Sequence, residues 1–114
     1  MRQFPSVVLN QTVSGSTTYN SAAIPAEYMF QLSAQIVAAG SGAGTLQLQV
    51  SNDYGTTGSF TPTNWSNITA ATVTVTGNGA FIIPQTYTCY KWVRLSYANT
   101  GTGTIVVTLQ AYGL

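Results

Sequence analysis

The chain carries very little charge. Charged residues make up 4% of its 114 residues, where about a quarter is usual in a soluble protein. They are Arg2, Glu27, Asp53, Lys91 and Arg94. A helical bundle needs charged side chains on its outer faces, and a nucleic-acid-binding domain needs a basic patch. The composition therefore argues against both classes, and a hydrophobic content of 45% argues against a disordered chain.

Catalytic and metal-binding residue types are nearly missing as well. Histidine is absent and Cys89 is the single cysteine, so there is no base to activate a nucleophile and no ligand set for zinc. Glu27 and Asp53 are the only acids, and they fall in different predicted loops. Glycoside hydrolysis would need two carboxyl groups flanking one bond. We therefore predict a protein that is not an enzyme and that uses no metal or cofactor.

The polar surface must come from hydroxyl and amide side chains. Apolar runs are only a few residues long, so we expect no membrane-spanning segment and no signal peptide. A neutral surface with a net charge of +1 has little self-repulsion and favours association. We therefore expect a subunit that packs against other protein, the alternative being an ordinary neutral soluble domain.

Apolar and polar residues alternate along much of the chain, which predicts strands with one buried and one solvated face. The expected strands lie near residues 6–9, 30–36, 46–50, 72–76, 80–83, 91–97 and 105–111. Gly-rich turns at residues 39–44, 77–79 and 99–103 are predicted to join successive strands as hairpins. The pattern predicts an all-β chain, with a single antiparallel β-sandwich or jelly roll of about seven or eight short strands over residues 1–114.

A weak internal repeat, with an offset of 59 residues, relates segment 30–51 to segment 89–110. Two Gly-Thr-rich segments can also align in this way by chance. The overlay places Val93, Leu95 and Tyr97 on the core face.

The same overlay places Tyr90, Trp92 and Arg94 on the opposite, outer face. Tyr, Trp and Arg are the residue types that dominate protein interfaces, and Arg94 can stack on Trp92. We therefore take these three as interface candidates. The alternative is a strand that is buried on both faces or a bulge that turns Trp92 inward.

Two further segments are candidates for binding. The long loop at residues 51–67 contains Asp53, Tyr54, Phe60 and Trp65, which can bind a sugar ring, anchor the loop to its own domain, or contact a neighbouring subunit. Residues 1–19 contain Phe4 and Val8, and they form either an arm that adds a strand to a neighbour or the first strand of the domain's own sheet.

Several segments carry a resemblance to a known group of proteins. They are residues 46–53, 62–68, 71–77, 89–97 and 101–104, which include Leu46-Gln47-Leu48-Gln49-Val50 and Tyr90-Lys91-Trp92-Val93-Arg94. Together they resemble small β-sandwich accessory proteins of tailed-bacteriophage virions, which decorate or cement the capsid or build head fibres and tail parts. Residues 54–61 depart from the shorter loops expected there.

The resemblance implies a non-enzymatic structural role in a virus particle. We expect a capsid decoration or cement protein at the capsid surface, whose partners are the major capsid protein or other virion subunits. A homo-oligomer, favoured as a trimer, suits a capsid lattice, and no nucleic-acid or membrane partner is expected. The alternatives are a glycan-binding β-sandwich module and a tail or fibre component.

Overall fold

The computed structural model describes residues 2–3, 6–41, 43–55 and 57–113, and all of their regular structure is β-strand. Ten strands follow one another along the chain: β1 (Arg2–Gln3), β2 (Ser6–Ser14), β3 (Thr17–Asn20), β4 (Ile24–Pro25), β5 (Met29–Gly40), β6 (Gly44–Ser51), β7 (Ser66–Val75), β8 (Gly79–Tyr87), β9 (Trp92–Asn99) and β10 (Thr102–Gly113). The predicted all-β fold is confirmed.

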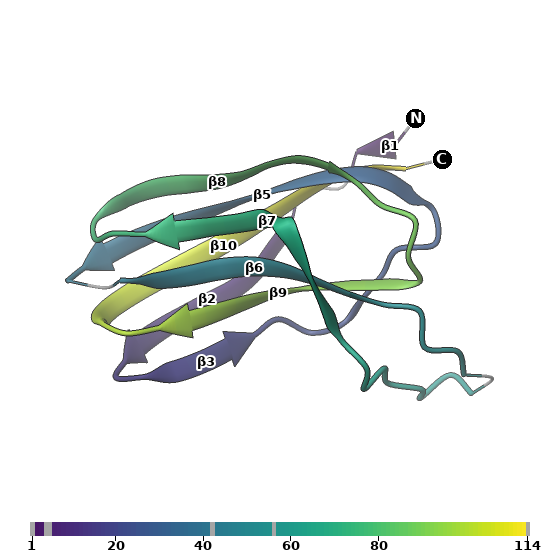
Figure 1. Ribbon diagram of the computed structural model, residues 1–114, viewed down its shortest axis with the longest axis horizontal. Coiled ribbons are helices and arrows are strands. Elements are labelled where there is room, and N and C mark those ends of the chain that lie inside the picture. Colours follow the sequence, from purple (N-terminus) through teal and green to yellow (C-terminus); the bar gives the residue numbers. More distant parts are fainter. Residues whose placement is uncertain (1, 4–5, 42, 56, 114) are drawn as a thin grey trace.

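The strands form two antiparallel sheets that pack face to face (Figure 1). Sheet A has the order β2-β10-β5-β8, with β1 also pairing to β10. Sheet B has the order β3-β9-β6-β7, with β4 also pairing to β9. The eight longer strands therefore make a jelly roll, in which two four-stranded sheets enclose one core. Both described chain ends lie at the same end of the sandwich, where Arg2 pairs with Gly113.

The predicted hairpins are wrong, although the turns lie where they were expected. The Gly-rich turns join β5 to β6, β7 to β8 and β9 to β10, and each of these pairs is divided between sheet A and sheet B. Hydrogen bonding instead links strands far apart in sequence, such as β5 with β10 and β6 with β9. Sequence alternation reports which face of a strand is buried, but it does not report which strand lies beside it.

Close contacts hold two of the turns that cross between the sheets. Gly40 and Gly103 lie opposite each other at the end of the β5–β10 pair, and both have positive φ angles. A Cβ atom on Gly103 would collide with the carbonyl oxygen of Ala39, so a larger residue is excluded there. The Asn78 side chain accepts a hydrogen bond of 2.6 Å from the Gly40 amide and so ties the β7–β8 turn to β5.

The repeat in the sequence has a structural counterpart. Under the 59-residue offset, β5 corresponds to β9 and β10 corresponds to β6. Ile36 lies opposite Val107 in sheet A, and its equivalent Leu95 lies opposite Leu48 in sheet B. The central strand pairs of the two sheets therefore share one register and are related by a pseudo-twofold.

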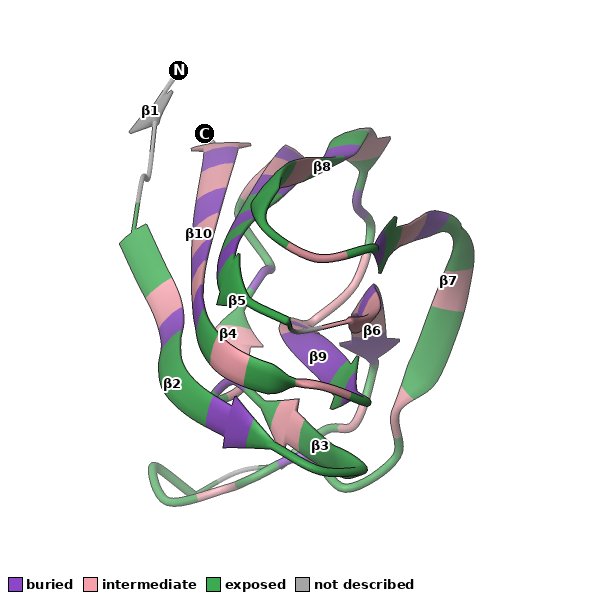
Figure 2. Ribbon diagram, turned by 90° about the vertical axis from the view of Figure 1, so that its left-hand side faces the viewer, coloured by how far each residue is buried: buried purple, intermediate pink, exposed green. Residues whose placement is uncertain are grey.

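The core lies between the two sheets (Figure 2). Val93, Leu95 and Tyr97 are fully buried, as the overlay predicts, and they pack with Leu46 and Leu48 from β6. Within the described part of the chain no helix has the length and apolarity needed to cross a bilayer.

The largest buried side chain is Tyr97, and its polar atom makes no hydrogen bond among the described residues. Its hydroxyl is buried and has no hydrogen-bond partner among the described residues, and burial raises its pKa. The end of its ring lies against the backbone of Gly44, where a Cβ atom would approach to 2.6 Å. A buried hydroxyl without a partner destabilises the folded state.

Tyr97→Phe should therefore raise the free energy of unfolding by about 1 kcal/mol, since it removes the unpaired hydroxyl and keeps the ring. Urea unfolding of both proteins measures the change. Tyr19→Phe, on the neighbouring strand and only half-buried, is the matched control and should change stability by less than about 0.5 kcal/mol. A loss of stability in Tyr97→Phe would show that the hydroxyl is hydrogen-bonded.

Candidate functional site

The longest connection in the molecule, residues 52–65, joins β6 to β7 at one end of sheet B (Figure 1). Among the strands described after β5, it is the only connection that joins two strands paired in the same sheet. This loop holds four of the predicted binding residues, and it lies beside the start of β9, where two more are found.

Asp53 organises the loop. Its Oδ2 atom accepts hydrogen bonds from the backbone amides of Thr63 at 2.8 Å and Asn64 at 2.9 Å, while the Asn64 side chain donates to Oδ1 at 3.0 Å. The hydroxyl of Ser51 accepts a bond from the Asp53 amide at 3.1 Å. These bonds join the two ends of the loop. The Asn64 and Thr63 amide bonds also hold the pKa of Asp53 below its usual value, because they stabilise the ionised carboxylate.

Two aromatic residues of the loop, Phe60 and Trp65, pack against the outer face of sheet B. The Trp92 indole N–H donates to the Asp53 carbonyl at 3.2 Å, and the Phe60 ring lies 6.2 Å from the Trp92 ring at 45°. The guanidinium of Arg94 lies 4.4 Å from the centre of the Trp65 ring. Phe60 and Trp65 therefore anchor the loop to its own domain, which is one of the three roles considered for them.

Arg94 differs from the sequence-based expectation. It stacks on Trp65, which lies far away in sequence, instead of Trp92. Its Nε donates to the Gln49 side chain at 2.7 Å, and Gln49 in turn donates to Asn67 at 2.8 Å. Burial lowers the pKa of Arg94, although a guanidinium remains charged at any ordinary pH.

The remaining candidates make fewer contacts with the loop. Tyr90 is half-buried against the core and lines a surface depression beside Asp53 and Asn64. Tyr54 is 73% exposed, with the Lys91 ammonium 5.3 Å from its ring. Val8 also packs against the core, whereas its neighbour Val7 is 60% exposed. Phe4 lies outside the described residues.

All four described charged side chains lie around this loop and the adjacent start of β9. Lys91 forms an ion pair of 2.9 Å with Glu27, and this hydrogen bond raises the Lys91 pKa. Asp53 is bound by backbone amides, and Arg94 by Gln49 and Trp65. Over residues 6–41, 43–55 and 57–112, no three His, Cys, Asp or Glu side chains come together as a metal site. The charged side chains thus stabilise the structure of the loop and of the segments beside it.

Sequence reasoning did not single out Gln49, Ser51 and Thr63, which complete this network. A local signal existed for part of it, because Ser and Asp side chains commonly bond to nearby backbone amides in turns. The contact between Gln49 and Arg94 had no such signal, since it depends on the pairing of β6 with β9.

No protein-family model matches the chain, and no curated protein sequence matches it. Solved structures do share its fold. It is similar to the PBSX exported protein XepA, with a TM-score of 0.76 and 14% identity over 97% of the chain, and it spans only 37% of that protein. It is also similar to a protein of the disulfide-linked pili of Bacillus endospore appendages, with a TM-score of 0.59, 13% identity, and coverage of 99% of this chain and 88% of that one. The SPBc2 prophage-derived protein YomS gives a TM-score of 0.50 and 8% identity, with 96% and 92% covered. At these identities the likeness shows a common fold alone.

Asp53→Asn should loosen the loop, because a neutral amide is a weaker acceptor for the Thr63 and Asn64 amides. Since the folded pKa of Asp53 is lowered, its contribution is complete above the ordinary value of 3.8 and is lost as the pH falls through the folded pKa below it. Tryptophan fluorescence, followed from about pH 6 to about pH 2, should show a transition in the native protein that Asp53→Asn lacks.

Glu27→Gln is the matched control. It removes the other acid and breaks an exposed ion pair, so it should leave that acid transition in place. An identical pH profile in the native protein and Asp53→Asn would show that the carboxylate does not hold the loop.

Proposed function

We propose that this protein is a non-enzymatic structural subunit of a bacteriophage virion, which decorates or cements the capsid surface. The neutral composition and the absence of histidine favour a role in protein contact over catalysis. The same fold occurs in a prophage-derived protein and in a pilus subunit, which is consistent with a structural role outside the cell. Its partners are the major capsid protein or other virion subunits.

The observation that carries the proposal is the open edge of β2. Among the described residues this strand pairs only with β10, so its other side presents an unpaired strand edge. Residues 6–14 contain no proline and no charged side chain, and Val7 within this strand is exposed. A bulge at Val8 interrupts the pairing, but residues 9–14 run without interruption.

Three of the other described edge strands are better protected, and the fourth, β3, is only four residues long. β8 contains Pro84 and a bulge, β4 contains Pro25, and the pairing of β7 is broken by a bulge opposite Leu48. Proline and bulges are the usual means by which proteins block unwanted strand addition. β2 lacks the proline and charge that would block it, and we propose that it adds to a strand of a neighbouring subunit.

Closed symmetry would organise such contacts, and we propose a trimer as the form that suits a capsid lattice. Weak contacts repeated over one shell add through multivalency, so no single interface need be large. A tail or fibre component with the same edge contact is the second candidate. Sugar binding by the loop gains no support, because the Phe60 and Trp65 rings contact Trp92 and Arg94.

Thr12→Lys tests the edge contact, since Thr12 is an exposed residue in the regular part of β2 and lysine discourages strand addition. The native protein should sediment at three times its protomer mass of 12.0 kDa and should bind empty capsids of its parent virus in mass photometry. The variant should sediment as the protomer and lose capsid binding by at least about tenfold.

Thr74→Lys places the same charge on β7, the edge of sheet B, and should behave like the native protein. Electron microscopy of labelled virions separates capsid decoration from a tail or fibre position. A native protein that remains a protomer and binds no part of the virion would contradict the proposal.

A further inference from the structure

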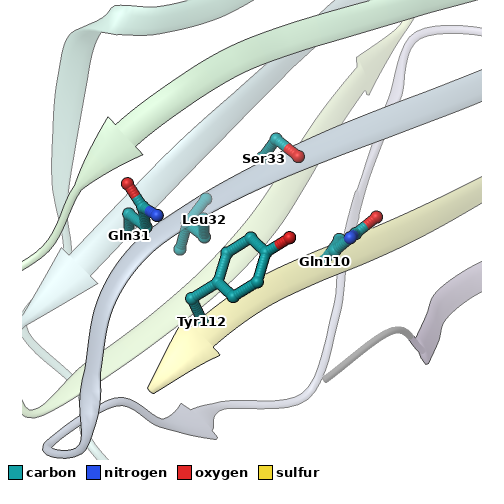
Figure 3. Close-up of a pocket in the computed structure, with 5 residues that line it drawn as sticks. All are labelled: Gln31, Leu32, Ser33, Gln110 and Tyr112. Carbon is teal, nitrogen blue, oxygen red and sulfur yellow. The ribbon is translucent and has the colours of Figure 1, made fainter. Parts of the chain in front are cut away.

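The outer face of sheet A contains a groove that no sequence motif predicted. It holds about 140 Å³ and is lined by Gln31, Ser33, Gln110 and Tyr112, with Leu32 at its base. Figure 3 shows Gln31 and Ser33 on β5 and Gln110 and Tyr112 on β10, with the Tyr112 ring lying along the groove. A second depression of about 280 Å³ shares Ser33 and Gln110 and continues toward Ile82 on β8. The two form one trough across three strands.

The pseudo-twofold explains why the trough exists. Under the 59-residue offset Ser33 is equivalent to Trp92, and Gln35 is equivalent to Arg94. In sheet B the large side chains at these positions bind the aromatic loop at residues 52–65. In sheet A the small Ser33 leaves space, and no segment among the described residues fills it.

Two tyrosines flank the trough at one end. Tyr112, Gln31 and Tyr87 lie opposite one another on β10, β5 and β8, so their side chains share the outer face. The outer strands of this row are about 10 Å apart, because neighbouring strands are separated by about 4.8 Å. Tyr87 is 75% exposed, so the face of its ring is accessible.

The chemistry of the trough is uncharged throughout. The strands that form sheet A from residue 6 onward contain no charged residue, and the trough offers amides and hydroxyls that both donate and accept hydrogen bonds. A neutral sugar presents hydroxyl groups of the same dual character around its edge and apolar C–H groups on its faces. A flat tyrosine ring provides an apolar surface for those faces and a polar hydroxyl at its tip.

We infer that this trough binds a neutral glycan chain, with Tyr112 and Tyr87 as stacking platforms and Ser33 and Gln110 as hydrogen-bonding groups. A chain of sugar rings matches this lining in its neutral charge and in its paired hydrogen-bond donors and acceptors, and a second copy of this protein on the trough is an outcome of the test below. The inference goes beyond the proposed capsid contact, because Thr12 and the open edge of β2 lie outside the trough.

Isothermal titration of the full chain with neutral hexasaccharides tests the inference, with cellohexaose, maltohexaose and chitohexaose as probes. At least one should bind saturably with a Kd below about 5 mM, a range expected for a shallow site. Because no charge is involved, the Kd should change less than about twofold between about 50 and about 500 mM NaCl.

Tyr112→Ala and Tyr87→Ala should each weaken binding by about tenfold through loss of stacking area. Tyr54→Ala removes an equally exposed tyrosine on the loop beside sheet B and should leave the Kd unchanged. Ser33→Trp provides a second test: it fills the trough with the residue found at the equivalent position in sheet B and should abolish binding, with the thermal unfolding midpoint as the check on folding.

Three results would overturn the inference. One is no saturable binding of any of the three probes. Another is binding that is lost in Tyr54→Ala and retained in Tyr112→Ala, which would place the sugar on the loop. The last is self-association of the native protein that Ser33→Trp abolishes, which would make the trough a protein interface. The first two results concern sugar binding alone and leave the capsid contact untouched. The third also bears on the proposed edge contact, and Thr12→Lys separates the two surfaces, because it changes the edge of β2 and leaves the lining of the trough intact.

Discussion

The hydrogen bonds of the Asp53 carboxylate determine which face of this jelly roll is covered. They close residues 52–65 on themselves, so that Phe60 and Trp65 lie against Trp92 and Arg94. The outer face of sheet B thereby gains an aromatic cover at one end. Sheet A has no such cover among the described residues, and its polar face and the β2 edge stay open.

The small number of charged residues makes this difference between the two sheets possible. Glu27 and Lys91 pair with each other, while Asp53 and Arg94 are bound within the loop region. The rest of the described surface is formed by hydroxyl, amide and apolar groups, which are easier to desolvate than ions. The outer faces of both sheets are therefore nearly free of ions away from the loop region.

The sequence predicted which face of each strand is buried, but it did not predict which strands pair with each other. Period-two alternation placed Val93, Leu95 and Tyr97 in the core, because a buried face selects apolar residues wherever the strand lies. The same alternation suggested hairpins at the Gly-rich turns, whereas these turns cross between the sheets. Pairing of β5 with β10 brings together residues far apart in the chain, and local patterns contain no information about such contacts.

At the candidate site, too, local sequence patterns did not predict the long-range contacts. Trp92 and Arg94 face outward as the overlay predicts, but the loop that covers them and the turn of Tyr90 toward the core depend on tertiary contacts. The trough in sheet A was hidden for a different reason. Gln31, Ser33 and Gln110 have the pattern of ordinary polar positions in alternating strands. The sequence overlay aligns Ser33 with Trp92, but the space beside Ser33 depends on the packing of β5 against β8 and β10.

The loop covers one end of the outer face of sheet B, whereas the outer face of sheet A has no such cover among the described residues. Hydroxyl-radical footprinting with mass spectrometry measures this directly, since it reports the solvent access of individual side chains. The account predicts slow oxidation of Trp92 and fast oxidation of Tyr87 in the folded protein, with Trp92 becoming reactive in Asp53→Asn. A folded native protein in which Trp92 reacts as fast as in urea would contradict it.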